Sequence, residues 1–243
     1  MIGTELLALR TTRLPWLLVV GAPLLTGVLA ANAVIGAGVD GAPSIGTAGA
    51  MLAVLGAIGP GRLVILLLGV LAVTAEFRHA TVTATFLRTP RRVRVLAAKA
   101  AAVVAVATMA AAADLAAALA VGLATGALPW PLVNPDVALH VFGLLAAYPL
   151  YGLIGVAAGA LIVFQPVAVL LPLAWVLYLE DFTLRFVPET VVPWSLTSVT
   201  AALAHSGTTV DVLPAAAGGA VLVAYALLLF AFGAARLARR DIT

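Results

Sequence analysis

The chain has 243 residues, of which 64% are hydrophobic and only 9% are charged. A soluble domain carries about 25% charged and about 45–50% apolar residues, so no soluble core would bury this surplus. Apolar runs of some 20 residues recur, and each is long enough to cross a hydrocarbon layer of about 30 Å as a helix. We therefore expect an all-α membrane protein that forms one transmembrane domain over residues 1–243.

The formal net charge is +3, and cysteine is absent. Most basic residues lie at the ends of apolar runs, where they set orientation in a membrane. This placement favours membrane lipid as their partner and argues against nucleic acid. The lack of cysteine excludes disulfides and thiolate metal sites. The three histidines are scattered without a close ligand pair, so no metal site is expected.

Three spans are predicted in the N-terminal half. Residues 1–14 form a short amphipathic segment, which predicts an interfacial helix. The first span covers about residues 15–35 and the second about residues 49–74. Gly59-Pro60-Gly61 interrupts the second span, so its outer part is expected to be a separate half-helix. The third span covers about residues 95–123.

Three more spans are predicted in the C-terminal half. A proline-rich turn precedes the fourth, about residues 137–163. The fifth starts near Pro166 and reaches Glu180 after too few residues to cross, so either Glu180 and Asp181 lie inside the helix or the helix is short. Residues 195–204 fit a short re-entrant or interfacial helix between spans five and six. The last span covers about residues 214–235.

Basic residues gather at three places along the chain. Two lie near the N-terminus, six in residues 76–99 and three in the tail, which makes eleven of the thirteen. They are Arg10 and Arg13; Arg78, Arg88, Arg91, Arg92, Arg94 and Lys99; and Arg236, Arg239 and Arg240. Six spans place all eleven on one side, whereas five or seven would divide them. The positive-inside rule then predicts that both termini and residues 76–99 are cytoplasmic.

Residues 76–99, EFRHATVTATFLRTPRRVRVLAAK, are polar in an otherwise apolar chain, and we call them the polar segment. Thr89-Pro90 is typical of an N-cap followed by proline at the first helical position. A short surface helix is therefore expected before this break, and the start of span three after it. The plainer interpretation is an ordinary positively charged loop.

The polar segment resembles the cytoplasmic loop of the type-2 (ABC2 membrane) permeases of ATP-binding cassette (ABC) exporters. Bacterial members carry Glu, an aromatic residue, Arg, two residues and Thr, then Leu, a Thr-Pro-Arg-Arg turn and Val-Leu-Ala-Ala-Lys. The matching residues are Glu76, Phe77, Arg78, Thr81, Leu87, Thr89, Pro90, Arg91, Arg92, Val95, Leu96, Ala97, Ala98 and Lys99. His79 and Ala80 match less closely. The ending Arg239-Arg240-Asp241-Ile242 also resembles the tail of that family.

The resemblance implies a transmembrane permease subunit with a cytoplasmic coupling helix between spans two and three, in a coupling loop over residues 76–94. That helix would dock on a soluble ABC ATPase subunit, present in two copies. The implied coupling residues are Glu76, Phe77, Arg78, Thr81, Thr85, Phe86, Leu87, Arg91 and Arg92. Glu76 is expected to orient Arg78 or to cap the coupling helix. A second permease subunit, identical or paralogous, would complete the transporter.

The implied substrate is hydrophobic or amphipathic, such as a drug, an antibiotic, a peptide or a lipid-like molecule, moved out of the cytoplasm or the inner leaflet. The implied location is the bacterial cytoplasmic (inner) membrane. Lys99 is the only lysine and alanine follows it, so the chain lacks the Gly-x-x-x-x-Gly-Lys-Ser/Thr phosphate loop. We therefore expect no bound cofactor and no enzyme activity of its own, with ATP and Mg on the partner ATPase.

Arg62 and Asp114 are ionisable residues inside predicted spans. At about 1.5 Å per residue, Arg62 lies about 21 Å along span two from Glu76, and Asp114 lies about 25 Å along span three from Ala97. Charges at such depth are costly and usually face a partner or a wet cavity. We expect the two to pair or to line the same outward cavity. The alternative is that Arg62 snorkels to the outer headgroups alone.

Tyr148, Tyr151 and Glu180 are candidates for a substrate path, although aromatic packing also explains the two tyrosines. Gly155 and Gly159 form a small-xxx-small pair that permits close helix contact, either within one chain or between two.

Two other function classes stay open. An ion-driven secondary transporter would predict internal repeats and charged sites at the membrane midplane, and the broken span near Gly59 is the one hint of it in the sequence. An intramembrane enzyme would need a nucleophile, a base or a metal set at one depth, and the sequence shows no such cluster.

Overall fold

The computed structural model describes residues 13–39, 41–78, 92–128, 135–204 and 213–239. Regular secondary structure in these ranges is helical, without a strand. The elements are α2 (Arg13–Ile35), α3 (Ala48–Gly56), α4 (Gly61–Arg78), α6 (Arg92–Ala124), α7 (Pro135–Leu161), α8 (Gln165–Ala174), the π-helical turn η1 (Trp175–Leu179), α9 (Glu180–Leu184), the 3-10 segment η2 (Glu189–Trp194), α10 (Leu196–Leu203) and α11 (Ala215–Arg239).

Six helical segments of the described chain are long and apolar enough to cross a membrane. They are Leu17–Ile35, Ala48–Arg78, Arg92–Ala124, Pro135–Leu161, Gln165–Leu184 and Ala215–Arg239. The predicted all-α membrane class with six spans is thereby confirmed. Most of the interfacial helix predicted over residues 1–14 falls outside the described ranges, and so does the coupling helix predicted before Thr89.

The half-helix predicted before Gly61 is confirmed. The N-cap of the short helix α3 is Thr47, whose hydroxyl accepts a hydrogen bond from the amide of Ala50 at 3.3 Å. α3 ends at Gly56 and α4 begins at Gly61. Tight turns fill the gap, because Pro60 has no amide hydrogen and clashes with a continuous helix.

The helices α4 and α7 pack with their backbones in contact. A Cβ atom at Gly69 would collide with the carbonyl oxygen of Gly152, and one at Gly155 would collide with that of Leu66. A Cβ atom at Gly159 would also approach the α4 backbone. The close contact predicted for Gly155 and Gly159 is therefore made within one chain, against α4.

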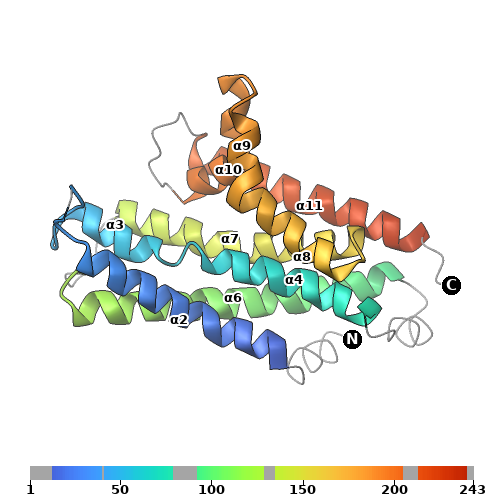
Figure 1. The fold of residues 1–243 in the computed structure, drawn as a ribbon, viewed down its shortest axis with the longest axis horizontal. Coiled ribbons are helices and arrows are strands. Elements are labelled where there is room, and N and C mark those ends of the chain that lie inside the picture. The colour runs from blue at the N-terminus through green and yellow to red at the C-terminus, as the bar shows by residue number, and fades with distance from the viewer. Residues whose placement is uncertain (1–12, 40, 79–91, 129–134, 205–212, 240–243) are drawn as a thin grey trace.

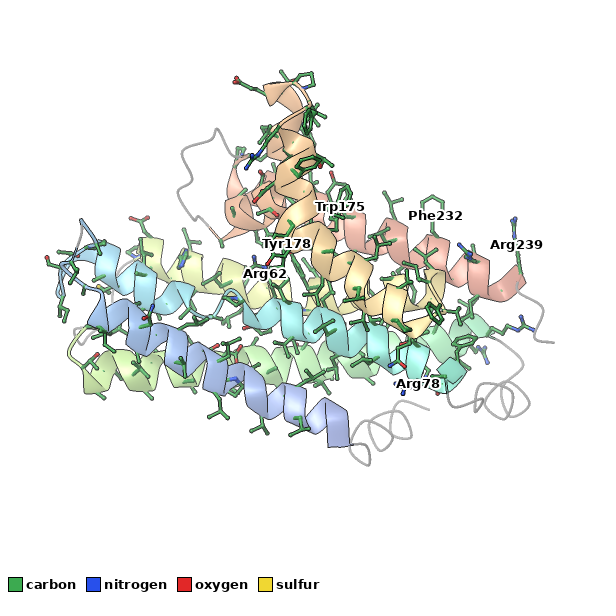
Figure 2. The ribbon with its side chains drawn as sticks, in the orientation of Figure 1. Arg62, Arg78, Trp175, Tyr178, Phe232 and Arg239 are labelled. Carbon is green, nitrogen blue, oxygen red and sulfur yellow. The ribbon has the colours of Figure 1, made fainter. Side chains whose placement is uncertain are left out.

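Four long helices lie side by side in the bundle: α2, α4, α6 and α7 (Figure 1). α11 packs along α7. The start of α2, the end of α4, the start of α6 and the end of α11 lie at the same end of the bundle, on the right in Figure 1. Arg78 and Arg239 are labelled at this end in Figure 2, and we call it the basic end. Arg62 lies near the middle of the bundle.

The fifth span projects from the bundle. α8, η1 and α9 form one continuous helical path from Gln165 to Leu184 that leaves the other helices at a steep angle (Figure 1). Glu180 and Asp181 therefore lie inside the helical segment, which was the first of the two predicted alternatives. Large apolar side chains on this path are exposed, including Trp175 and Tyr178 (Figure 2).

Candidate functional site

The break between α3 and α4 brings the backbone against two polar side chains in the centre of the bundle. A Cβ atom at Gly61 would overlap the Oδ2 atom of Asp114 on α6 and the hydroxyl of Tyr148 on α7. Asp114 and Tyr148 are both fully buried. Only glycine therefore fits the start of α4 at this point, and the three helices meet there.

Asp114, Tyr148 and the helix break form a short hydrogen-bonded chain. The hydroxyl of Tyr148 bonds to the Oδ2 atom of Asp114. The same hydroxyl lies 2.6 Å from the carbonyl oxygen of Ile58, inside the break. The second carboxyl oxygen of Asp114, Oδ1, is buried and has no hydrogen-bond partner among the described residues. Thr26 of α2 is also buried and faces this carboxyl group.

Arg62 has a different set of partners. Its Nη1 donates to the carbonyl oxygen of Gly59 at 2.6 Å, one helical turn earlier. The guanidinium carbon lies 5.4 Å from the centroid of the Tyr151 ring, a distance typical of a cation–π contact. Its Nε is buried without a hydrogen-bond partner in the described chain. The structure shows no ion pair between Arg62 and Asp114, two residues that it describes fully.

The structure nevertheless places both ionisable residues against one helix. Tyr148 and Tyr151 are three residues apart on α7, so they lie on the same face. Asp114 contacts the first and Arg62 the second. The predicted direct pair is thus replaced by two contacts to neighbouring tyrosines, and an outward cavity shared by the two charges stays a prediction.

Tyr151 and His140 connect α7 to α10. The hydroxyl of Thr200 donates to the carbonyl oxygen of Leu196 at 2.7 Å, which uses its one hydrogen. Tyr151 must therefore donate to Thr200, at 3.1 Å. His140 on α7 lies with Nδ1 2.5 Å from the carbonyl oxygen of Ala204, so this nitrogen carries the hydrogen.

Glu180 is a buried carboxylate at the start of α10. The backbone amide of Thr197 donates to both of its oxygens at 3.2 Å, and the Thr197 hydroxyl donates to Oε2 at 2.5 Å. Ser195, the N-cap residue, accepts from the amide of Ser198 at 3.1 Å. The N-terminus of α10 is therefore capped twice, by its own serine and by the fifth span.

Glu180 also lines an apolar cavity of about 680 Å³. This cavity lies between the projecting fifth span, α7, α11 and η2, and its walls include Trp175, Trp194 and Tyr225. Of the three residues predicted for a substrate path, Glu180 is at the cavity. Tyr148 and Tyr151 are fully buried in the core and do not line it.

A buried ion pair joins α4 and α6 at the basic end. Nζ of Lys99 lies 2.5 Å from Oε1 of Glu76, and the two side chains are 6% and 22% exposed. Glu76 ends span two and Lys99 lies near the start of span three, so the pair joins the two helices that flank residues 79–91. Glu76 bonds to Lys99 here and Arg78 bonds to Gln165, so the role of Glu76 in orienting Arg78 stays a prediction.

Two further contacts extend from these flanking helices. Nη1 of Arg78 donates to the side-chain oxygen of Gln165, at the start of α8, at 3.2 Å. Nη1 of Arg92 donates to the carbonyl oxygen of Leu237 on α11 at 3.3 Å. A second cavity of about 820 Å³ lies beside Arg78, with Phe77 in its wall. The remaining predicted coupling residues, Thr81, Thr85, Phe86, Leu87 and Arg91, lie outside the described residues.

Several of these partners were not identified from the sequence. Thr200 and Thr197 carry no sequence signal, because threonine is common on apolar helices. Lys99 was recognised as part of the polar segment but not as a buried partner of Glu76. The sequence did offer one signal for this residue. Lys99 is the only lysine and lies beyond the start of an apolar span, where a charge usually has a partner.

Among the described residues, no group of three or more His, Cys, Asp or Glu side chains is arranged to hold a metal ion. Comparison of the sequence with protein-family models and with curated proteins found no match. The class that the fold defines is therefore a six-span helical membrane protein, and a finer assignment depends on the geometry above.

Proposed function

We propose that this chain is the membrane subunit of an ATP-driven exporter, in which a separate ATPase subunit acts on the polar segment. The proposal begins from the resemblance of residues 76–99 to the coupling loop of type-2 ABC permeases. Two permease subunits and two ATPase subunits make the working unit. Both termini and the polar segment lie on the cytoplasmic side of the bacterial inner membrane.

The observation that carries the proposal is the set of contacts beside residues 79–91. Glu76 and Lys99 join α4 to α6, Arg78 joins α4 to α8, and Arg92 joins α6 to α11. A force applied between α4 and α6 therefore reaches four of the six spans through polar contacts at one end. Packed helices shift as units, so such contacts suit a subunit that receives motion from a partner.

The apolar cavity at Glu180 supports a hydrophobic or amphipathic substrate. Its walls are almost wholly hydrophobic, and one side is the exposed fifth span. A site of this kind takes up molecules that partition into the bilayer, because burying apolar surface drives their binding. Drugs, antibiotics, peptides and lipid-like molecules share that chemistry.

The test is co-purification followed by ATPase measurement. A tagged copy expressed in its native host should retain a soluble ATPase of separate sequence, and an amphipathic substrate should stimulate the ATP hydrolysis of that complex. Phe86→Asp and Leu87→Asp together should abolish retention. Ala238→Asp, an exposed position at the basic end outside the polar segment, is the matched control and should retain the ATPase. Full retention by the double variant contradicts the docking role.

An ion-driven secondary transporter is the second candidate. It is favoured by one observation, the broken span that meets a buried carboxylate at Gly61. Discontinuous helices beside an ionisable group are typical of secondary transporters. Vesicles that contain only the purified chain distinguish the two functions. Uptake driven by an imposed proton gradient without ATPase supports the secondary transporter, and absence of uptake until an ATPase subunit and ATP are added supports the exporter.

A further inference from the structure

Three oxygen atoms lie in a row at the break between α3 and α4. They are Oδ2 of Asp114, the hydroxyl oxygen of Tyr148 and the carbonyl oxygen of Ile58. The tyrosine oxygen is within hydrogen-bond distance of both neighbours, at 2.6 Å from Ile58. Neighbouring oxygens in this row are in direct hydrogen-bond contact, so no water molecule fits between them, and Gly61 packs against the first two.

Two hydrogen bonds in this row require two hydrogens. A tyrosine hydroxyl has one, a backbone carbonyl has none, and an ionised carboxylate has none. If Tyr148 donates to Ile58, the contact between Tyr148 and Asp114 needs a hydrogen from Asp114. If Tyr148 donates to Asp114, the oxygens of Tyr148 and Ile58 face each other at 2.6 Å without a hydrogen between them. Only a protonated carboxyl group satisfies both contacts.

We propose that Asp114 is a proton-binding site, which takes one proton from water and holds it as a neutral carboxylic acid. Its Oδ2–H donates to Tyr148, and Tyr148 donates to the carbonyl of Ile58. This site is independent of the exporter function proposed above, since it needs only the described residues.

The surroundings of Asp114 favour the neutral acid. Oδ1 is buried without a hydrogen-bond partner in the described chain, an arrangement that is far more costly for an ionised carboxylate than for an acid. The titratable group in contact with it is Tyr148 of α7, and Arg62 of α4, which is bonded to Gly59, acts on Tyr148. α2 contributes the hydroxyl of Thr26, a further donor toward the carboxyl group that does not itself titrate. The other core neighbours are apolar: Ile58, Ala110, Ala111, Ala118 and Leu144.

Loss of the proton changes the helix break. The proton leaves to water and Asp114 becomes an anion, so the single hydrogen of Tyr148 turns toward the carboxylate. The carbonyl of Ile58 then loses its side-chain donor and keeps only the amide of Gly61, at 3.1 Å. Proton occupancy is thereby coupled to the conformation of the backbone between α3 and α4.

Infrared spectroscopy tests the proposal on the purified full chain in lipid nanodiscs at neutral pH. A protonated carboxylic acid has a C=O stretching band that carboxylates and amides lack. The band should move on labelling with ¹³C-aspartate and disappear in Asp114→Asn. Asp136→Asn removes an exposed aspartate at the start of α7, is the matched control, and should leave the band unchanged.

Tyr148→Phe provides a second measurement if Asp114→Asn fails to fold. Without the tyrosine oxygen the acid loses its hydrogen-bond acceptor, so the band should persist and shift to higher frequency. A wild-type spectrum with no aspartate-labelled acid band at neutral pH overturns the proposal. So does a band that is unaffected by both Asp114→Asn and Tyr148→Phe.

Discussion

Arg62 and Asp114 both reach the tyrosines of α7, and neither takes the other as its partner. Burying an ion pair removes two charges from water, and the attraction between them often does not offset that cost. Arg62 instead uses a carbonyl oxygen from its own helix break and an aromatic face. Asp114 uses a hydroxyl group. Each residue is thus contacted by groups that carry no full charge.

Gly61→Ala should destabilise the protein by about 1–3 kcal/mol, because overpacking a filled core forces its neighbours out of place. The added methyl group would overlap Oδ2 of Asp114 and the hydroxyl of Tyr148. Thermal unfolding in detergent, followed by tryptophan fluorescence, measures the change. Gly27→Ala on α2 adds a methyl group where no atom lies within 4 Å, and it should be neutral. Equal stability of both variants would contradict the close contact at Gly61.

The ion pair at the basic end should respond asymmetrically to substitution. Glu76→Gln removes the negative charge beside Lys99, whose side chain is 6% exposed. Lys99→Met leaves Glu76, which is 22% exposed and better reached by water. Glu76→Gln should therefore cost on the order of 2 kcal/mol and Lys99→Met less. The free energies of unfolding of both single variants and of the double variant give the coupling energy between Glu76 and Lys99. A double variant that is no more stable than Glu76→Gln would argue against this coupling.

At the scale of elements, α10 is a short helix held from three sides. Glu180 caps its N-terminus from the fifth span, Tyr151 bonds to Thr200 in its middle, and His140 bonds to Ala204 at its end. Helices of this length are unstable alone, so their order depends on such contacts. The position of α10 is therefore tied both to α7 and to the projecting fifth span.

Glu180→Gln should loosen α10 without unfolding the bundle. It removes the charged acceptor from the N-terminus, and caps of this kind contribute about 0.5–2 kcal/mol. Hydrogen exchange should speed up at the amides of residues 196–203 and stay unchanged in α4. Asp181→Asn alters the exposed neighbour and should leave exchange in α10 as in the wild type. Uniform acceleration across the chain would show a global effect instead of a lost cap.

The elements were largely predictable, whereas the polar partners were not. Gly59-Pro60-Gly61 predicts the break because a proline between two glycines disfavours a continuous helix, and span length follows from apolar runs. The contacts of Tyr148 with Ile58 and of Glu180 with Thr197 join residues 90 and 17 positions apart. Helical periodicity shows which residues share a face but not which helix that face meets. Long-range pairing therefore needed the structure.

At the scale of the molecule, most described basic residues near the span ends gather at one end of the bundle, and Arg185 at the end of the fifth span is the exception. Arg78 and Arg239 lie there in Figure 2, although they are far apart in the sequence. An even number of spans brings both chain ends to one side. This arrangement agrees with the sequence argument for six spans, and it assigns a side to each connection once the orientation is known.

Single cysteines test that orientation, because the natural chain has none. Ser44→Cys and Thr125→Cys are exposed at the far end, and Arg94→Cys and Ala238→Cys are exposed at the basic end. A membrane-impermeant maleimide added to intact cells should label the first pair only. The second pair should react after the membrane is opened. Labelling of Arg94→Cys or Ala238→Cys in intact cells would contradict a cytoplasmic basic end.

The helix break has a consequence for the order in which the protein is made. Arg62 bonds to Gly59 in its own segment, so the second span can enter the bilayer with one hydrogen bond to its guanidinium already made. Asp114 arrives next, on α6, and its hydrogen-bond partner Tyr148 follows only with α7. During synthesis the third span must therefore wait beside the translocation machinery, or insert with a neutral acid, until the fourth span is complete. The close packing of α4 against α7 at their glycines also forms only when the fourth span is complete.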